Sequence, residues 1–155
     1  MKYQNVTFCI GGEGLYSTYG AQEVQVFPEK HIIKSSAKGE TNVAEVRWLT
    51  ELILESASSW KETGWGYVVG INDMEPVNHE VSKELVELHK KVETAGCKAI
   101  AFIDPDALIL SLQAKNHQRK SKTSNKEKHF KTEEEAFAWV EKILHKKTKI
   151  KTNEI

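Results

Sequence analysis

Two apolar segments separated by one amphipathic helix constrain the fold of this chain most. Residues 65–72 and 97–103 are continuous apolar runs of the kind found in strands that are buried on both faces of a sheet. Between them, residues 78–95 have helical spacing, with an apolar side formed by Val81, Leu85, Leu88 and Val92. Gly96 provides a C-terminal cap. Because a connection that contains a whole helix normally joins parallel neighbours, the pattern predicts two adjacent parallel strands with a helix packed over them.

The rest of the chain extends this unit into one α/β domain. Alternating patterns predict strands at residues 5–10, 23–27 and 31–37, whose closeness in sequence favours an antiparallel meander. A short strand is expected at residues 128–131. Four helices are expected, starting near Asn42, Asn78, Asp104 and Thr132, each of which can act as an N-cap. The fold class is therefore α/β, with a mixed β-sheet in which an N-terminal antiparallel meander is followed by β/α crossovers. Residues 1–145 form this domain, and residues 146–155 are expected to be a basic frayed tail.

Charge is balanced overall and uneven along the chain. The 155 residues contain 22 Lys and Arg and 22 Asp and Glu, with a net charge of −6 in residues 1–112 and +6 in residues 113–155. The basic part includes Lys115–Lys128, which could contact nucleic acid or an anionic membrane. It has neither aromatic residues for base stacking nor an apolar helix face for insertion. A solvated loop is therefore favoured, and nucleic acid is not expected as a partner.

No segment of the sequence indicates a membrane span, a disulfide framework or a metal site. Cys9 and Cys97 each lie in an apolar strand pattern, where a small buried thiol is the ordinary expectation. The N-terminus lacks the apolar run of a signal peptide, so a cytoplasmic location is expected. The histidines outside the 72–80 loop lack metal-ligand spacing and are expected to be surface groups: His31, His89, His117, His129 and His145. No cofactor and no metal are expected.

The loop after the first buried strand is the favoured functional region. Ligands of open α/β sheets collect beyond the carboxyl ends of parallel strands, and residues 72–80 leave such an end. Together with the end of the neighbouring strand, this loop gives the candidate binding residues Asp73, Met74, Glu75, Asn78, His79, Asp104 and Asp106. Asp73, Glu75 and His79 could bind a polar ligand or act in acid–base chemistry. In the structural alternative, Asn78 only caps the helix and the acids are solvated.

Most aromatic residues lie in strand or helix stripes, where core packing is favoured over a pocket for a fatty or aromatic ligand. Trp60 differs because it lies in a polar stretch, and it is expected to be exposed or at an interface.

Four segments together resemble the SpoIIAA-like, or STAS-like, domains, in particular a branch of small uncharacterised bacterial proteins. Residues 37–42 resemble the sheet-to-helix turn of that branch, residues 65–74 its central strand and following loop, residues 96–101 its next strand, and residues 130–140 its closing strand and helix. The resemblance covers most of residues 23–145 and implies the fold much more than an activity.

The anti-sigma-factor antagonists of this fold group have a phosphorylatable serine at the start of the helix after the central strand. The matching stretch here is residues 78–81, which contains no serine, and Ser82 lies one turn into the helix. The phosphorylation switch is therefore not expected.

These observations favour a non-catalytic regulatory or binding module that contacts a protein partner or a small ligand, apolar or anionic, and they leave a homodimer open. The first alternative is an enzyme that uses Asp73, Glu75 and His79. The second is a lipid carrier with a dry internal cavity.

Overall fold

The computed structural model describes residues 6–8, 15–71, 75–104 and 126–153, with side-chain environments for residues 17–71, 75–104 and 126–145. Within these ranges the strands form one seven-stranded sheet: β1 (Val6–Phe8), β2 (Leu15–Tyr19), β3 (Gln22–Phe27), β4 (Ile32–Ala37), β5 (Trp65–Gly70), β6 (Cys97–Ile103) and β7 (Lys126–Phe130). The helices are α1 (Val43–Ser56), the 3₁₀ turn η1 (Ser58–Trp60), α2 (His79–Thr94) and α4 (Glu133–Asn153).

The strand order in the sheet is the order in the chain, β1 to β7. β1 to β4 pair antiparallel, and β4 to β7 pair parallel. β5 and β6 lie side by side in parallel, with Tyr67 opposite Ile100 and Val69 opposite Phe102. These pairings confirm the predicted mixed sheet and the strand–helix–strand unit on which the sequence interpretation depended.

One strand was not predicted. β2 pairs with both β1 and β3, and the β2–β3 hairpin closes at Gly20, whose φ is +59°. Leu15–Tyr19 has polar residues on both sides of the alternation, so the hydrophobic period that identified the other strands is missing.

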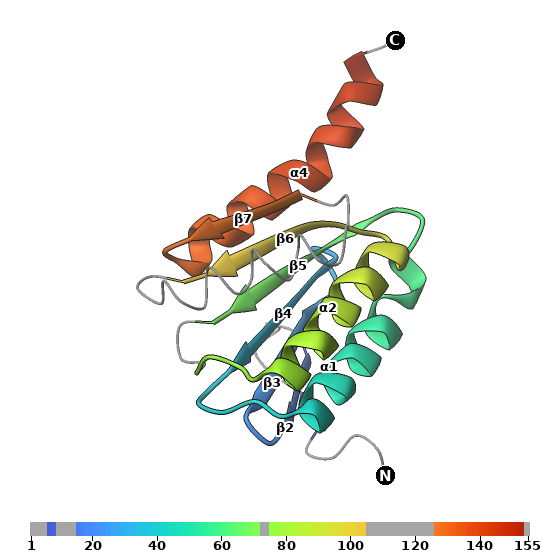
Figure 1. Cartoon of the computed structure of the whole chain (residues 1–155). Helices are drawn as coiled ribbons and strands as arrows, with labels where there is room; N and C mark the ends of the chain where they lie inside the picture. The colour runs from blue at the N-terminus through green and yellow to red at the C-terminus, as the bar shows by residue number, and fades with distance from the viewer. Residues whose placement is uncertain (1–5, 9–14, 72–74, 105–125, 154–155) are drawn as a thin grey trace.

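Three of the four expected α-helices lie in the described ranges. The expected helix after Asp104 falls in residues 105–125, outside the described residues. α4 continues to Asn153, beyond the boundary expected at residue 145, and its C-terminal part projects past the sheet (Figure 1).

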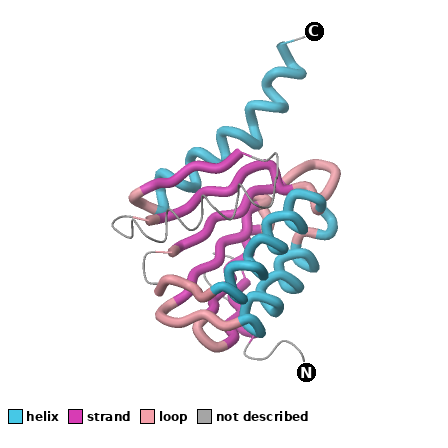
Figure 2. The backbone as a smooth tube through the Cα atoms, viewed as in Figure 1, coloured by secondary structure: helices cyan, strands magenta, loops and turns pink. Residues whose placement is uncertain are grey.

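Helices cover both faces of the sheet (Figures 1 and 2). On one face, α1 and α2 enclose a core that includes Val24, Ile33, Trp48, Ile53, Trp65, Tyr67, Leu88, Val92 and Ile100. On the other face, α4 packs on Ile32, Val68, Ala99 and Ala101 through Ala136, Phe137 and Val140. This two-sided burial explains why β5 and β6 are apolar at almost every position.

Helix capping follows the sequence closely. Asn42 Oδ1 accepts a hydrogen bond from Glu45 N at 2.8 Å, and Thr132 Oγ1 accepts one from Glu135 N at 3.2 Å. The buried Glu45 carboxylate in turn accepts bonds from Ala21 N and Gln22 Nε2, both at 3.2 Å. Glu45 therefore ties the β2–β3 hairpin to the start of α1.

Three expectations for individual side chains were wrong. Trp60 is only 8% exposed and stacks on His31, with ring centroids 4.7 Å apart. His89 is 4% exposed, and His129 is half-buried with its ring stacked on Phe102 at 4.9 Å. Position 89 lies four residues after Leu85, so it belongs to the apolar side of α2 despite its polar side chain.

Candidate functional site

The predicted site lies at the carboxyl edge, the edge of the sheet at which β4, β5, β6 and β7 end. Ile71 N donates to Ile103 O at 3.1 Å, so β5 and β6 stay paired up to the residues at which their loops begin. The C-terminal ends of β5 and β6 therefore lie next to one another, as the sequence predicted.

The β5–α2 loop is attached to the neighbouring β4–α1 turn. Glu75 N donates to Gly39 O at 2.9 Å, and Gly39 has a φ of +76°, which favours glycine. Two loops that are far apart in the sequence thus form one continuous surface.

Asn78 has the structural role that the sequence left open. Its side-chain oxygen accepts a hydrogen bond from Val81 N at 2.9 Å, and its own backbone is extended, as an N-cap requires. His79 is the first residue of α2 and is exposed, and Glu80 provides a carboxylate in the positively polarised first turn. Ser82 is half-buried within α2, with its backbone N–H bonded to Asn78 O at 2.9 Å.

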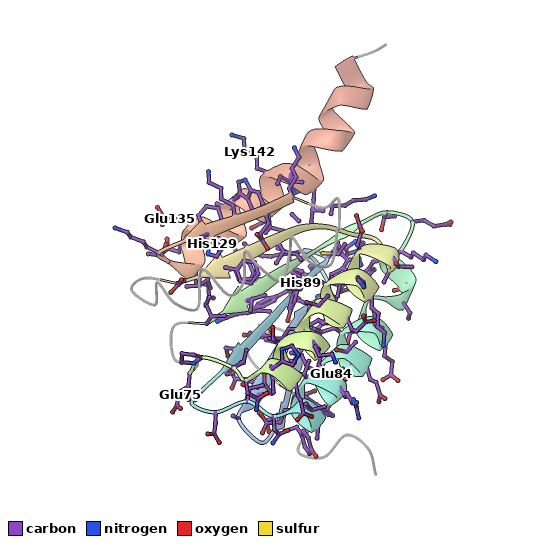
Figure 3. All side chains as sticks on the ribbon, viewed as in Figure 1. Glu75, Glu84, His89, His129, Glu135 and Lys142 are labelled. Carbon is purple, nitrogen blue, oxygen red and sulfur yellow. The ribbon has the colours of Figure 1, made fainter. Side chains whose placement is uncertain are left out.

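The structure brings part of the predicted set to this edge. Glu75 and His79 are exposed on the loop and at the start of α2, and Figure 3 shows Glu75 at the margin of the molecule. Asp104 is half-buried at the end of β6, where its backbone N–H donates to Phe130 O at 2.8 Å and joins β6 to the end of β7. Asp73, Met74 and Asp106 lie outside the described residues.

The edge carries more acidic than basic groups. Glu40, Glu75 and Glu80 are all exposed there, and Lys38 is exposed at the end of β4. In the sequence, Glu40 stood outside the favoured loop. The parallel pairing of β4 with β5, together with the hydrogen bond between Glu75 and Gly39, which joins positions 36 residues apart, places it beside that loop.

Within the described ranges, no three His, Cys, Asp or Glu side chains are grouped in a way that could hold a metal ion.

A polar and aromatic group under α2 also escaped the sequence interpretation. The Phe102 ring lies between His129, stacked at 4.9 Å, and His89, edge-on at 6.3 Å. Strand pairing explains this arrangement, because His129 is opposite Phe102 in the parallel β6–β7 pair and therefore points to the same face. Figure 3 shows both histidines on the side of the sheet that α2 covers.

None of the described helices is long and apolar enough to cross a membrane.

Comparison with known proteins identifies the fold. The structure is similar to the crystal structure of an uncharacterized protein of the DUF3478 family with a SpoIIAA-like fold, from Shewanella loihica. The TM-score is 0.62 and the sequence identity 17%, over 82% of this chain and 99% of that chain. The chain therefore has a SpoIIAA-like fold, as the sequence resemblance implied. No protein-family model matches the sequence, and no curated protein matches it either.

Proposed function

We propose that this protein is a non-catalytic binding module that recognises a protein partner through the carboxyl edge. The observation that carries the proposal is the hydrogen bond between Glu75 N and Gly39 O, which joins the β5–α2 loop and the β4–α1 turn into one exposed surface. Loops that are held by a rigid sheet are common positions for binding residues.

The charges of this surface specify the kind of partner. Among the described residues of the β4–α1 turn and the β5–α2 loop, Glu40, Glu75 and Glu80 are exposed and outnumber the one exposed lysine, Lys38. A complementary partner presents lysine or arginine side chains, because opposite surface potentials steer association and select against other partners.

The exposure of Glu75 and His79 supports recognition over catalysis. Acid–base catalysis gains most in a site that excludes water, whereas these two side chains are open to solvent. We do not propose regulation by serine phosphorylation, because residues 78–81 contain no serine and Ser82 lies inside α2.

Co-purification from the native host tests this function. The tagged protein and its Glu75→Lys/Glu80→Lys variant are purified from host cells and examined by native mass spectrometry, which also reports whether the protein is a homodimer. We expect the unmodified protein to retain a basic partner and the double variant to retain at least about tenfold less, because two attractive contacts become repulsive.

Glu29→Lys is the matched control, because Glu29 is exposed in the β3–β4 turn at the other end of β4. This variant should retain the partner as the unmodified protein does. Equal loss in both variants, or no retained partner in any preparation, contradicts the proposal. Chemical-shift mapping with the identified partner should then move the amide signals of Gly39, Glu75 and His79.

A further inference from the structure

An open groove of about 510 Å³ lies where the C-terminal ends of α1 and α2 meet. Its lining consists of Leu54, Lys61, Lys90, Lys91, Thr94 and Ala95. Trp65, the first residue of β5, donates through Nε1 to Ala95 O at 2.9 Å, so the groove lies at the amino end of β5. It is therefore at the opposite end of the sheet from the carboxyl edge, and it does not depend on the function proposed for that edge.

The backbone fixes the shape of this groove. Gly96, directly after α2, has a φ of +99°, and a Cβ atom there would lie 2.4 Å from Lys61 O. The backbone of Lys61 therefore rests directly against the end of α2, and this contact forms one wall. The other wall is the last turn of α1, which contains Leu54 and runs beside α2 (Figure 1).

The groove combines an apolar surface with positive charge. Leu54 and Ala95 are half-buried, and the methylene stems of the three lysines add apolar surface. Every charged residue of the lining is a lysine. Lys90 has a partner in Glu87, with Nζ and Oε2 3.5 Å apart. Across the described parts of the chain, no carboxylate lies within salt-bridge distance of Lys61 or Lys91.

Stabilisation of a helix C-terminus explains only one of the two lining lysines that have no carboxylate partner among the described residues. A lysine in the last turn of a helix complements the partial negative charge of its C-terminus, which explains Lys91. Lys61 follows η1 and belongs to neither α-helix, so that explanation does not include it.

We propose that this groove binds a single-chain fatty acid. The carboxylate lies between the ammonium groups of Lys61 and Lys91, and the hydrocarbon chain lies over Leu54 and Ala95. The volume is in the range of small-molecule sites, roughly 300–1,000 Å³. An apolar surface beside unpaired ammonium groups matches an amphiphile with one anionic end, because each part of such a ligand finds its complement.

A titration with decanoate, kept below its micelle concentration, tests the site in the full-length protein. NMR spectra should show saturable shifts with one-to-one stoichiometry at the amides of Lys91, Thr94 and Ala95. Trp65 fluorescence should change in parallel, because its indole N–H is bonded to Ala95 O. Decanol, which has the same chain and no charge, should bind at least about fivefold more weakly, since it lacks both ion pairs.

Substitutions separate the groove from general surface binding. Lys61→Gln/Lys91→Gln should raise the dissociation constant for decanoate about tenfold, whereas Lys142→Gln should leave it unchanged. Lys142 is an exposed lysine on α4, away from α1 and α2 (Figure 3). Urea unfolding of each variant verifies that it is folded.

Three results would overturn the proposal: shifts that fail to saturate or cluster at the carboxyl edge, equal affinity for decanol, and equal loss in Lys142→Gln. The amide positions and the decanol comparison report on the site even if the double variant does not fold.

Discussion

Gly96 lets the end of α2 lie directly against the backbone of Lys61. Replacing Gly96 and Gly39 by alanine separates the cost of a left-handed backbone from the cost of a steric clash. Gly96→Ala places a Cβ in a left-handed conformation and 2.4 Å from Lys61 O. Gly39 is also left-handed, but a Cβ there would lie 3.8 Å from its nearest neighbour, the Glu75 Oε2 atom.

We expect Gly39→Ala to lower the free energy of unfolding by about 1 kcal/mol and Gly96→Ala by more than ~2 kcal/mol. Urea unfolding measures both values. Equal costs for the two variants would show that the contact between Gly96 and Lys61 does not constrain the backbone.

Tyr67 provides the core with a polar contact that depends on pH. Its hydroxyl and Ser35 Oγ are 2.6 Å apart, and both residues are buried. Burial raises the pKa of Tyr67 well above its usual value of 10.0. The folded state thus holds the phenolic proton more tightly than the unfolded state does. The resulting stability is complete below pH 10 and declines as the pH rises above that value.

Tyr67→Phe should cost about 1–2 kcal/mol at pH 7, because Ser35 loses its partner in the core. Above pH 10 the variant should lose stability less steeply than the unmodified protein, as measured by urea unfolding at several pH values. If the unfolding free energies of the two proteins changed with pH in parallel, burial would not oppose ionisation of Tyr67.

Individual side chains were predictable only where neighbours in the sequence determine them. The cap at Asn78 follows from its position before an amphipathic segment and was foreseen as an alternative to a binding role. Trp60 belongs to the core beneath α1 and α2 and stacks on His31, which is 29 positions away and becomes adjacent only in the folded chain. Local polarity around Trp60 therefore gave the wrong expectation.

At the scale of elements, the packing of α4 on the sheet includes one particularly close approach, between Val140 and Gly66. Gly66 in β5 has no side chain, and a Cβ there would lie 2.1 Å from Val140 Cγ1 of α4. The Cβ of Val140 is 3.5 Å from the same point, which is an ordinary contact distance. A shorter residue at position 140 therefore makes room for a longer one at position 66.

Gly66→Ala alone should destabilise the protein by about 1–3 kcal/mol through overpacking, and Val140→Ala alone by about 2 kcal/mol through a cavity. The double variant should be more stable than the sum of the two effects predicts, by at least ~1 kcal/mol. Additive effects in this double-mutant cycle would contradict the described packing of α4 on β5.

The capping role of Asn78 at the start of α2 can be tested by substitution. Asn78→Ala removes the acceptor for Val81 N and should lower the free energy of unfolding by about 1 kcal/mol, whereas Asn78→Asp keeps the cap and most of the stability. Thermal unfolding measures both. If aspartate is as damaging as alanine, the cap is not the reason for asparagine at this position.

Elements with a clear hydrophobic period were predicted, and the element without one was missed. β5, β6, α1 and α2 each bury a continuous apolar face, and the sequence located all four. β2 depends on pairing with β3 for its conformation, and its polar residues conceal that dependence. The carboxyl edge followed from the predicted topology, but the participation of Glu40 depended on a long-range hydrogen bond that no sequence pattern indicates.

For the whole molecule, the expected domain boundary at residue 145 can be tested by truncation. Among the α4 residues whose side-chain environments are described, Ile143 and Leu144 are the last that pack on the sheet, and the helix backbone then projects past it (Figure 1). Removal of residues 146–155 should therefore change the free energy of unfolding by less than ~0.5 kcal/mol. Thermal unfolding monitored by circular dichroism measures this change. A decrease in the free energy of unfolding of more than ~2 kcal/mol would show that the segment belongs to the domain.

The agreement between strand order and chain order has a consequence for synthesis in the cell. Each strand that leaves the ribosome can join the one made just before it, so the sheet can grow in a single direction. α4 is made after all seven described strands, however, and until then the face that contains Ile32, Val68 and Ala101 has no cover from it. A nascent chain, or one terminated before α4, would thus expose an apolar surface that chaperones and proteases recognise, and docking of α4 would be the step that covers it.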